Sequence, residues 1–195
     1  MTSYSAHPPL IQRLLPVPNV ALRTALQLLL GVAFIALSAQ VRVAIGPVPI
    51  TGQTLGVLLV AASYGLSLGS LTVLSYLIIG GLGVGVFTGG ASGWAYLSGA
   101  TGGYLLGFLL AALLVGYVSE RGWSKHYGLM AAAMLLGNLA IYIPGMLWLG
   151  QFAPQGYSLS WAFSVGILPF LVGDAIKLAL AMALLPSVWR ALPKE

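Results

Sequence analysis

An acid and a base lie three positions apart near the end of the chain, inside an otherwise apolar stretch. Asp174 and Lys177 are the only ionisable residues of residues 161–185. On a helix this spacing places both side chains on the same face. A lone charge at the centre of a bilayer costs about 2.5 to 3.5 kcal/mol, so the pair must either neutralise itself or serve a function. We expect it to bind a ligand that carries a carboxylate and amide-like groups, with a purely structural ion pair as the alternative.

Further polar side chains lie near the ends of the apolar stretches and between them. We predict additional ligand contacts from Thr51, Gln53, Thr88 and Tyr104. Trp and Tyr also anchor proteins at the membrane surface, so most of the remaining polar and aromatic residues there are expected to be interfacial. These are Gln40, Arg42, Trp94, Tyr96, Gln151 and Tyr157. Two more, Asn138 and Tyr142, lie within an apolar stretch and are predicted to form hydrogen bonds between helices.

The sequence lacks the residues and motifs of several enzyme and cofactor-binding classes. The chain has no cysteine, which excludes disulfides, thiolate metal ligands and a cysteine nucleophile. It has no G-x-x-x-x-G-K-[ST] motif, so any ATP must be hydrolysed by a partner. The glycines of residues 81–85 follow no strand, which argues against a dinucleotide site. Ser92 resembles the serine of an intramembrane protease, but both histidines fall on the predicted opposite side of the membrane and cannot serve as its base. We therefore predict neither an enzyme nor a metal or cofactor site.

The composition identifies lipid as the main solvent of the chain. Of the 195 residues, 59% are hydrophobic and 6% are charged, against about a quarter charged in soluble domains. Residues 43–119 contain no acid, lysine or arginine, and at roughly 20 residues per span they leave room for three helices. We predict an all-α integral membrane protein with six transmembrane helices joined by Gly- and Pro-rich loops. The predicted helices are residues 21–39, 54–66, 68–86, 102–118, 127–149 and 161–185.

Basic residues gather on one side of this predicted bundle. Arg42 alone falls on the side opposite the termini. By the positive-inside rule both termini are cytosolic, and the loops at residues 40–53, 87–101 and 150–160 face outward together. The net charge of +5 therefore reports topology and gives no support to nucleic-acid binding. The basic residues on the side of the termini are Arg13, Arg23, Arg121, Lys125, Arg190 and Lys194.

The domain organisation follows from these spans. Prolines in the first 18 residues disfavour a long helix, and we interpret residues 1–20 as a flexible cytosolic tail. Residues 21–190 form the six-helix substrate-binding domain, and residues 191–195 form a cytosolic C-terminal tail. Residues 21–39 also resemble a signal peptide, but its cleavage would leave the next helix without a packing partner.

Small residues recur at a spacing of four along several predicted helices. Such pairs let two helices approach closely, which is a packing role. Ala21 and Ala25 show this spacing at the start of the first helix, where a partner protein or a neighbouring helix could dock. The glycine pairs are Gly65 with Gly69, and Gly103 with Gly107.

Three motifs occur in order along the chain: residues 46–55 (GPVPITGQTL), residues 99–108 (GATGGYLLGF) and residues 173–177 (GDAIK). Together they resemble the signatures of the BioY family, the biotin-binding S components of energy-coupling factor (ECF) transporters. The resemblance runs from the first predicted helix to the last.

This resemblance implies an ECF S-component-like bundle that captures biotin with high affinity near its outer face, for uptake across the cytoplasmic membrane. Asp174 and Lys177 would contact the ligand, and Thr88 stands where the family often has asparagine. The implied partners are a transmembrane coupling subunit and two ATP-binding-cassette ATPases, which alone would use ATP. Ala21 and Ala25 resemble the surface by which such subunits dock on the coupling subunit.

Three other functions stay open at this point. Because a fold does not fix its ligand, the same bundle could serve another small vitamin. A membrane transferase acting on lipid would need an acid or base at the headgroup level, where only Arg42 is available. A channel would leave Asp174 and Lys177 merely paired and would conduct ions without a saturable ligand.

Overall fold

The computed structural model describes residues 9–192, and most of them are helical. Asn19 begins the first long helix by accepting a hydrogen bond from the Leu22 amide, at 3.0 Å, with its side chain. The helices are α1 (Leu10–Leu14), α2 (Val20–Gln40), α3 (Gln53–Gly81), α4 (Trp94–Leu97), α5 (Gly102–Glu120), α6 (Tyr127–Leu149), α7 (Leu159–Gly166) and α8 (Leu171–Ala191). Short 3-10 turns are η1 (Thr88–Gly90), η2 (Trp123–Lys125), η3 (Gly150–Phe152) and η4 (Leu168–Phe170).

Helices of the described chain are long and apolar enough to cross a membrane in 5 places. They confirm the prediction of a helical protein with several membrane spans. Length and composition alone do not settle the predicted number of six, because α3 contains the predicted helix at residues 54–66 and most of the one at residues 68–86, which ends earlier than predicted, at Gly81. The candidate spans are Val20–Gln40, Gln53–Gly81, Gly102–Glu120, Tyr127–Phe152 and Leu159–Ala191.

Gly65 bends α3 back on itself. Its φ of 79° and ψ of −172° are not helical, and a positive φ of this kind is open chiefly to glycine. Ala61 and Gly69 would lie about 12 Å apart along an unbroken helix, yet a Cβ on Gly69 would stand 3.1 Å from the Ala61 Cα. The Leu66 amide at the start of the second half donates a hydrogen bond to the Glu120 carboxylate at 2.8 Å.

The last predicted helix is interrupted near its start. The prediction was one helix over residues 161–185, whereas the structure has α7, the turn η4 and then α8. Pro169 lies in η4, and proline lacks the amide hydrogen that an uninterrupted helix would use there.

A short β-hairpin departs from the predicted all-helical class. Strands β1 (Arg42–Val43) and β2 (Ile50–Thr51) pair antiparallel, with Arg42 opposite Thr51 and Val43 opposite Ile50. The hairpin falls in the predicted loop at residues 40–53. A two-residue strand gives too short a pattern to be recognised in a sequence.

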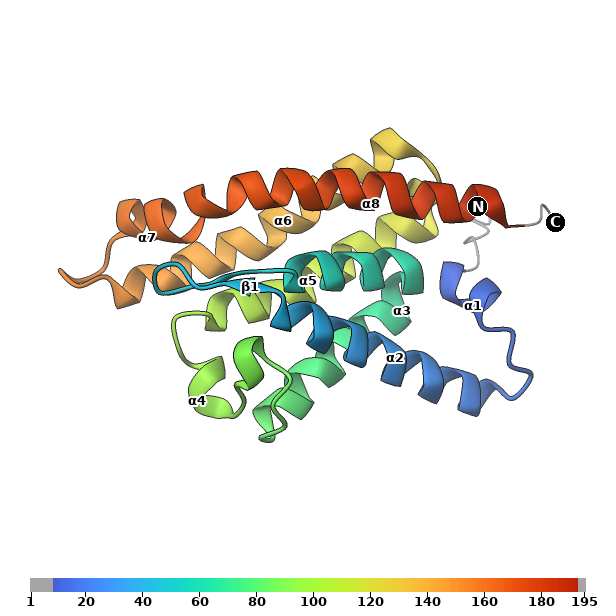
Figure 1. The fold of residues 1–195 in the computed structure, drawn as a ribbon, viewed down its shortest axis with the longest axis horizontal. Coiled ribbons are helices and arrows are strands. Elements are labelled where there is room, and N and C mark those ends of the chain that lie inside the picture. Colours follow the sequence, from blue (N-terminus) through green and yellow to red (C-terminus); the bar gives the residue numbers. More distant parts are fainter. Residues whose placement is uncertain (1–8, 193–195) are drawn as a thin grey trace, which may run out of the picture.

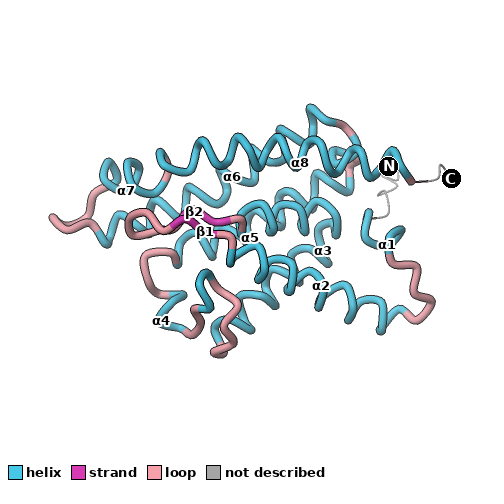
Figure 2. The backbone as a smooth tube through the Cα atoms, viewed as in Figure 1, coloured by secondary structure: helices cyan, strands magenta, loops and turns pink. Residues whose placement is uncertain are grey.

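Different secondary-structure elements lie at the two ends of the molecule (Figure 1). The helix α1 and the C-terminal end of α8 lie at one end, while the hairpin, α4 and α7 lie toward the other. Figure 2 shows the hairpin in magenta, and α3 begins directly after its second strand. Within the predicted N-terminal tail, α1 packs on the bundle, because Leu10 and Ile11 are buried.

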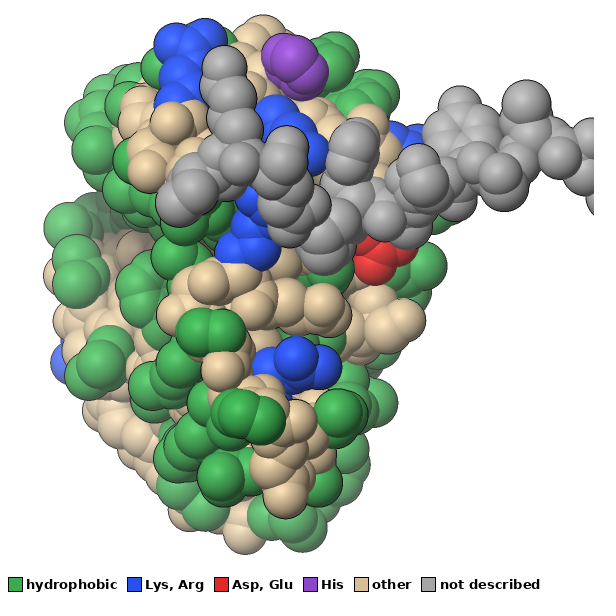
Figure 3. Space-filling model, turned by 90° about the vertical axis from the view of Figure 1, so that its right-hand side faces the viewer, with side chains coloured by type: hydrophobic (Ala, Val, Ile, Leu, Met, Phe, Trp, Pro, Cys, Tyr) green, Lys and Arg blue, Asp and Glu red, His purple; other side chains and the backbone are tan. Residues whose placement is uncertain are grey.

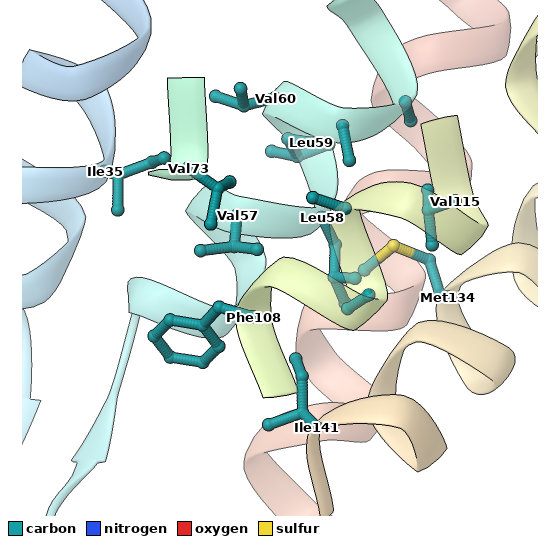
Figure 4. Close-up of a cluster of buried hydrophobic side chains, with 14 of the residues drawn as sticks. Ile35, Val57, Leu58, Leu59, Val60, Val73, Phe108, Val115, Met134 and Ile141 are labelled. Carbon is teal, nitrogen blue, oxygen red and sulfur yellow. The ribbon is translucent and has the colours of Figure 1, made fainter. Parts of the chain in front are cut away.

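The core lies between α2, α3, α5 and α6 (Figure 4). Ile35, Val57 and Ile141 belong to it and have no exposed surface. The small residues of α5 allow a close approach to α6, since a Cβ on Gly107 would stand 2.7 Å from the Ile141 Cα. The predicted packing role of this glycine is therefore confirmed.

Candidate ligand-binding site

A partly open cavity lies beneath the hairpin and between the helices that carry the predicted polar residues. The hairpin contributes its second arm, and α3, α5, α6 and α8 contribute the walls. The lining residues are Val48, Pro49, Ile50, Thr51, Gln53, Thr54, Thr88, Tyr96, Thr101, Tyr104, Leu105, Phe108, Tyr142, Phe170 and Lys177.

The predicted charge pair forms one polar wall. The Lys177 ammonium donates to the Asp174 carboxylate at 3.1 Å and to the Thr54 hydroxyl at 2.8 Å. The second oxygen of Asp174 accepts a hydrogen bond from the phenol of Tyr142. The carboxylate is thus held from α6 and from its own helix, and the ammonium bridges α8 to the start of α3. Each charge has partners, as burial in a membrane protein requires.

A second polar network forms another part of the wall. The Gln53 side-chain amide donates to the Tyr76 phenol at 2.6 Å, and its carbonyl accepts from the Thr88 hydroxyl at 3.2 Å. Tyr76 in turn donates to the Val86 carbonyl at 3.0 Å. Gln53 and Thr88 are both buried, so this network joins the start of α3 to η1 by bonds that are shielded from water.

Aromatic rings enclose the remaining volume. Tyr142 and Phe170 stack with ring centroids 6.2 Å apart, and Tyr104 stands edge-on to both. The Tyr104 phenol donates to the Gly166 carbonyl at the end of α7, at 2.9 Å. The cavity therefore offers apolar ring faces between its polar walls, an arrangement suited to a compact ligand with polar groups at its edges.

The structure brings the predicted ligand-binding residues together. Thr51, Gln53, Thr88, Tyr104 and Lys177 all line the cavity. Asp174 does not line it, but its carboxylate bonds to Tyr142 and Lys177, which do. These residues are far apart in sequence and come from the hairpin, α3, η1, α5 and α8.

Several lining residues were not predicted as ligand contacts. Tyr142 forms the interhelical hydrogen bond that the sequence suggested, and it also faces the cavity. Thr54, Thr101 and Phe170 line the cavity as well. A hydroxyl-bearing aromatic within an apolar helix was a usable signal for Tyr142, whereas Phe170 looks like any lipid-facing ring.

The predicted partner-docking residues lie away from the cavity. Ala21 and Ala25 are exposed on α2, and neither belongs to the cavity wall. Among residues 9–192 no group of three or more His, Cys, Asp or Glu side chains is placed to hold a metal ion.

Comparison with known proteins gives one consistent family. The family model described as "BioY family" matches residues 12–194. The chain is 39% identical over 153 residues to the "Probable biotin transporter BioY" of Pyrococcus horikoshii, covering 78% of this chain and 88% of that protein. It is 36% identical over 179 residues to "Biotin transporter BioY2" of Lactococcus lactis subsp. cremoris, covering 89% and 94%.

A solved structure has the same fold. It is the crystal structure of the S-component for biotin from an ECF-type ABC transporter, and it superposes with a TM-score of 0.79. The match is 25% identical in sequence and covers 90% of this chain and 95% of that one.

Proposed function

The chain belongs to the BioY family, and on that premise we propose that it takes up biotin as the substrate-binding subunit of an ECF-type transporter. It is a multi-pass membrane protein of a transporter family and not an enzyme. The transferase considered above is thereby excluded. The proposed membrane is the cytoplasmic membrane of the cell.

One observation carries the proposal beyond family membership: the cavity under the hairpin matches the chemistry of biotin. Biotin has an apolar bicyclic body, a ureido group with two N–H donors and one carbonyl acceptor, and a carboxylate. The wall offers an acceptor in the Gln53 side chain and donors in Lys177 and Tyr142. Aromatic faces lie between them. The proposed contacts are Asp174, Lys177, Thr88, Gln53, Thr51 and Tyr104. Asp174 acts either through its neighbours Lys177 and Tyr142, or directly, once the ligand replaces Tyr142 as the donor to its carboxylate.

The proposed topology has six membrane crossings and cytosolic termini. The reversal at Gly65 supports a division of α3 into two crossings. The common location of α1 and the C-terminal end of α8 supports placing both termini on one side (Figure 1). Lys, Arg and His side chains gather at that end (Figure 3), as the positive-inside rule expects for the cytosolic face. A reporter fused after Glu195, which lies outside the described residues, would be active only in the cytosol.

The proposed assembly contains a transmembrane coupling subunit and two ATP-binding-cassette ATPases. Ala21 and Ala25 are its proposed docking residues, and their exposure one helical turn apart on α2 supports this role. The proposed domain bounds remain residues 1–20 for the tail, 21–190 for the substrate-binding domain and 191–195 for the C-terminal tail.

Titration calorimetry of the detergent-purified chain tests the ligand. Biotin is expected to bind saturably, one molecule per chain, to protein shown to be folded and free of co-purified biotin. Thiamin and riboflavin serve as competitors, and displacement of biotin by either at comparable concentration would favour a broader vitamin carrier. Absence of biotin binding would refute the proposal.

A further inference from the structure

Arg42 is a cation beside the cavity without an acidic partner in the described part of the chain. Its guanidinium makes no hydrogen bond or ion pair with another of residues 9–192. The other nearby cation, Lys177, is already neutralised by Asp174 at 3.1 Å. Glu120 is bonded to the Leu66 amide, beside the bend in α3. Among the described residues near the cavity, Arg42 is therefore the positive charge that no acidic side chain compensates, and it is available to an anionic ligand.

The position of Arg42 is fixed by two elements that border the cavity. On β1 it is paired with Thr51, which lines the cavity. Its guanidinium lies against Gly89, so closely that a side chain at Gly89 would collide with it. Gly89 follows Thr88, another lining residue. Arg42 is itself exposed, so its long side chain is free to turn from Gly89 toward the cavity.

We propose that Arg42 receives the ligand's carboxylate at the edge of the cavity and thereby selects the ionised acid over neutral analogues. This inference rests on the proposed function and adds the orientation of the ligand. The carboxylate points toward Arg42 and Thr88, and the uncharged ureido group points toward Lys177, Asp174 and Tyr142. Lys177 and Asp174 together present a dipole without net charge, which suits an amide-like group.

Guanidinium chemistry favours this assignment. Arginine offers a planar fork of N–H donors that can hold a carboxylate with two parallel hydrogen bonds. A single cation at an outward mouth also attracts an anionic ligand before contact, and that attraction weakens as salt is added. Closing of the hairpin over the ligand would then bring the side chain and the carboxylate out of bulk water together.

The test compares biotin with its carboxamide, which has the same shape and no charge. Wild type, Arg42→Gln and Arg42→Lys are titrated with both ligands, with Arg121→Gln as the matched control. Arg121 is exposed and lies against Tyr117 near the end of α5. Arg42→Gln is expected to weaken biotin binding about tenfold, which corresponds to about 1.4 kcal/mol, and to leave carboxamide binding within twofold. Arg42→Lys is expected to keep part of the preference, and Arg121→Gln all of it.

Normal carboxamide binding by Arg42→Gln also shows that the variant is folded. Equal weakening of both ligands would reduce Arg42 to a structural contact of the hairpin and overturn the inference. It would be overturned as well if the preference for the acid survived Arg42→Gln but vanished in Lys177→Ala. In both cases biotin binding by wild type leaves the proposed function intact, whereas a wild type that binds no biotin refutes both.

Discussion

The phenol of Tyr142 on α6 donates a hydrogen bond to the carboxylate of Asp174 on α8. The bond joins a residue that lines the cavity to one that does not. It also occupies the carboxylate oxygen that Lys177 leaves free, since Lys177 bonds to the other. The geometry of the charged wall therefore depends on a neutral side chain from a different helix.

Tyr142→Phe removes this donor while keeping the ring that stacks on Phe170. A hydrogen bond to a charged group contributes about 1.5 to 3 kcal/mol to stability. Because its loss leaves the Asp174 carboxylate less firmly held beside the cavity, we expect biotin affinity to fall by roughly tenfold. Titration calorimetry measures it. The control is Tyr157→Phe, because Tyr157 is exposed and does not line the cavity. An unchanged affinity in Tyr142→Phe would contradict a role for this bond in the site.

Asp174→Asn and Lys177→Met are expected to be strongly non-additive. Each single change leaves its partner's charge partly buried and uncompensated, which costs more than loss of the pair. Both singles should weaken biotin binding more than tenfold. The double variant should unfold at a higher temperature than the less stable single variant. A double-mutant cycle on thermal stability and on affinity checks this; simple addition of the two effects would show that the charges act independently.

Gly65→Ala is expected to destabilise the protein. The substitution forces an L side chain into a φ of 79°, where a Cβ would also collide with the Glu120 carboxylate. Strain of this kind costs about 1 to 3 kcal/mol, so the unfolding temperature in detergent should fall by several degrees.

Gly128→Ala provides the matched control for that measurement. Gly128 lies in α6, and a Cβ there would meet no atom within 4 Å. Alanine is the better helix former, so this variant should be as stable as the wild type or slightly more stable. Equal unfolding temperatures for the two variants would mean that the bend at Gly65 tolerates a side chain.

Ala25→Trp separates partner docking from ligand binding. A bulky ring at this exposed position on α2 would block close helix contact. Biotin binding to the isolated chain should stay within twofold of wild type, while biotin uptake in cells that supply the energising subunits should fall at least tenfold. Leu180→Trp, at an exposed position on α8, is the control and should preserve uptake. Normal uptake with Ala25→Trp would exclude this face as the docking surface.

The charge pair was predictable because charges are conspicuous in an apolar sequence. Asp174 and Lys177 stood out from their neighbours by type alone, and their spacing fixed their common face. Gln53 and Thr88 were also found, although their mutual hydrogen bond spans 35 residues of sequence. Tyr142 and Phe170 were missed as cavity residues, because a membrane-facing ring and a ligand-facing ring have the same sequence signature.

The sequence by itself determined that the chain is a membrane protein, that its long apolar segments are helical and where charge is buried, since these follow from composition and local spacing. The sequence also predicted a break between residues 66 and 68, but only the tertiary structure decided that Gly65 turns the chain back on itself there. It alone decided that the segment after α2 forms a hairpin over a cavity and that the Arg42 guanidinium lies against Gly89. Such relationships depend on which helices pack together. Packing is set by the summed fit of many small contacts between distant residues, and no local pattern records that sum.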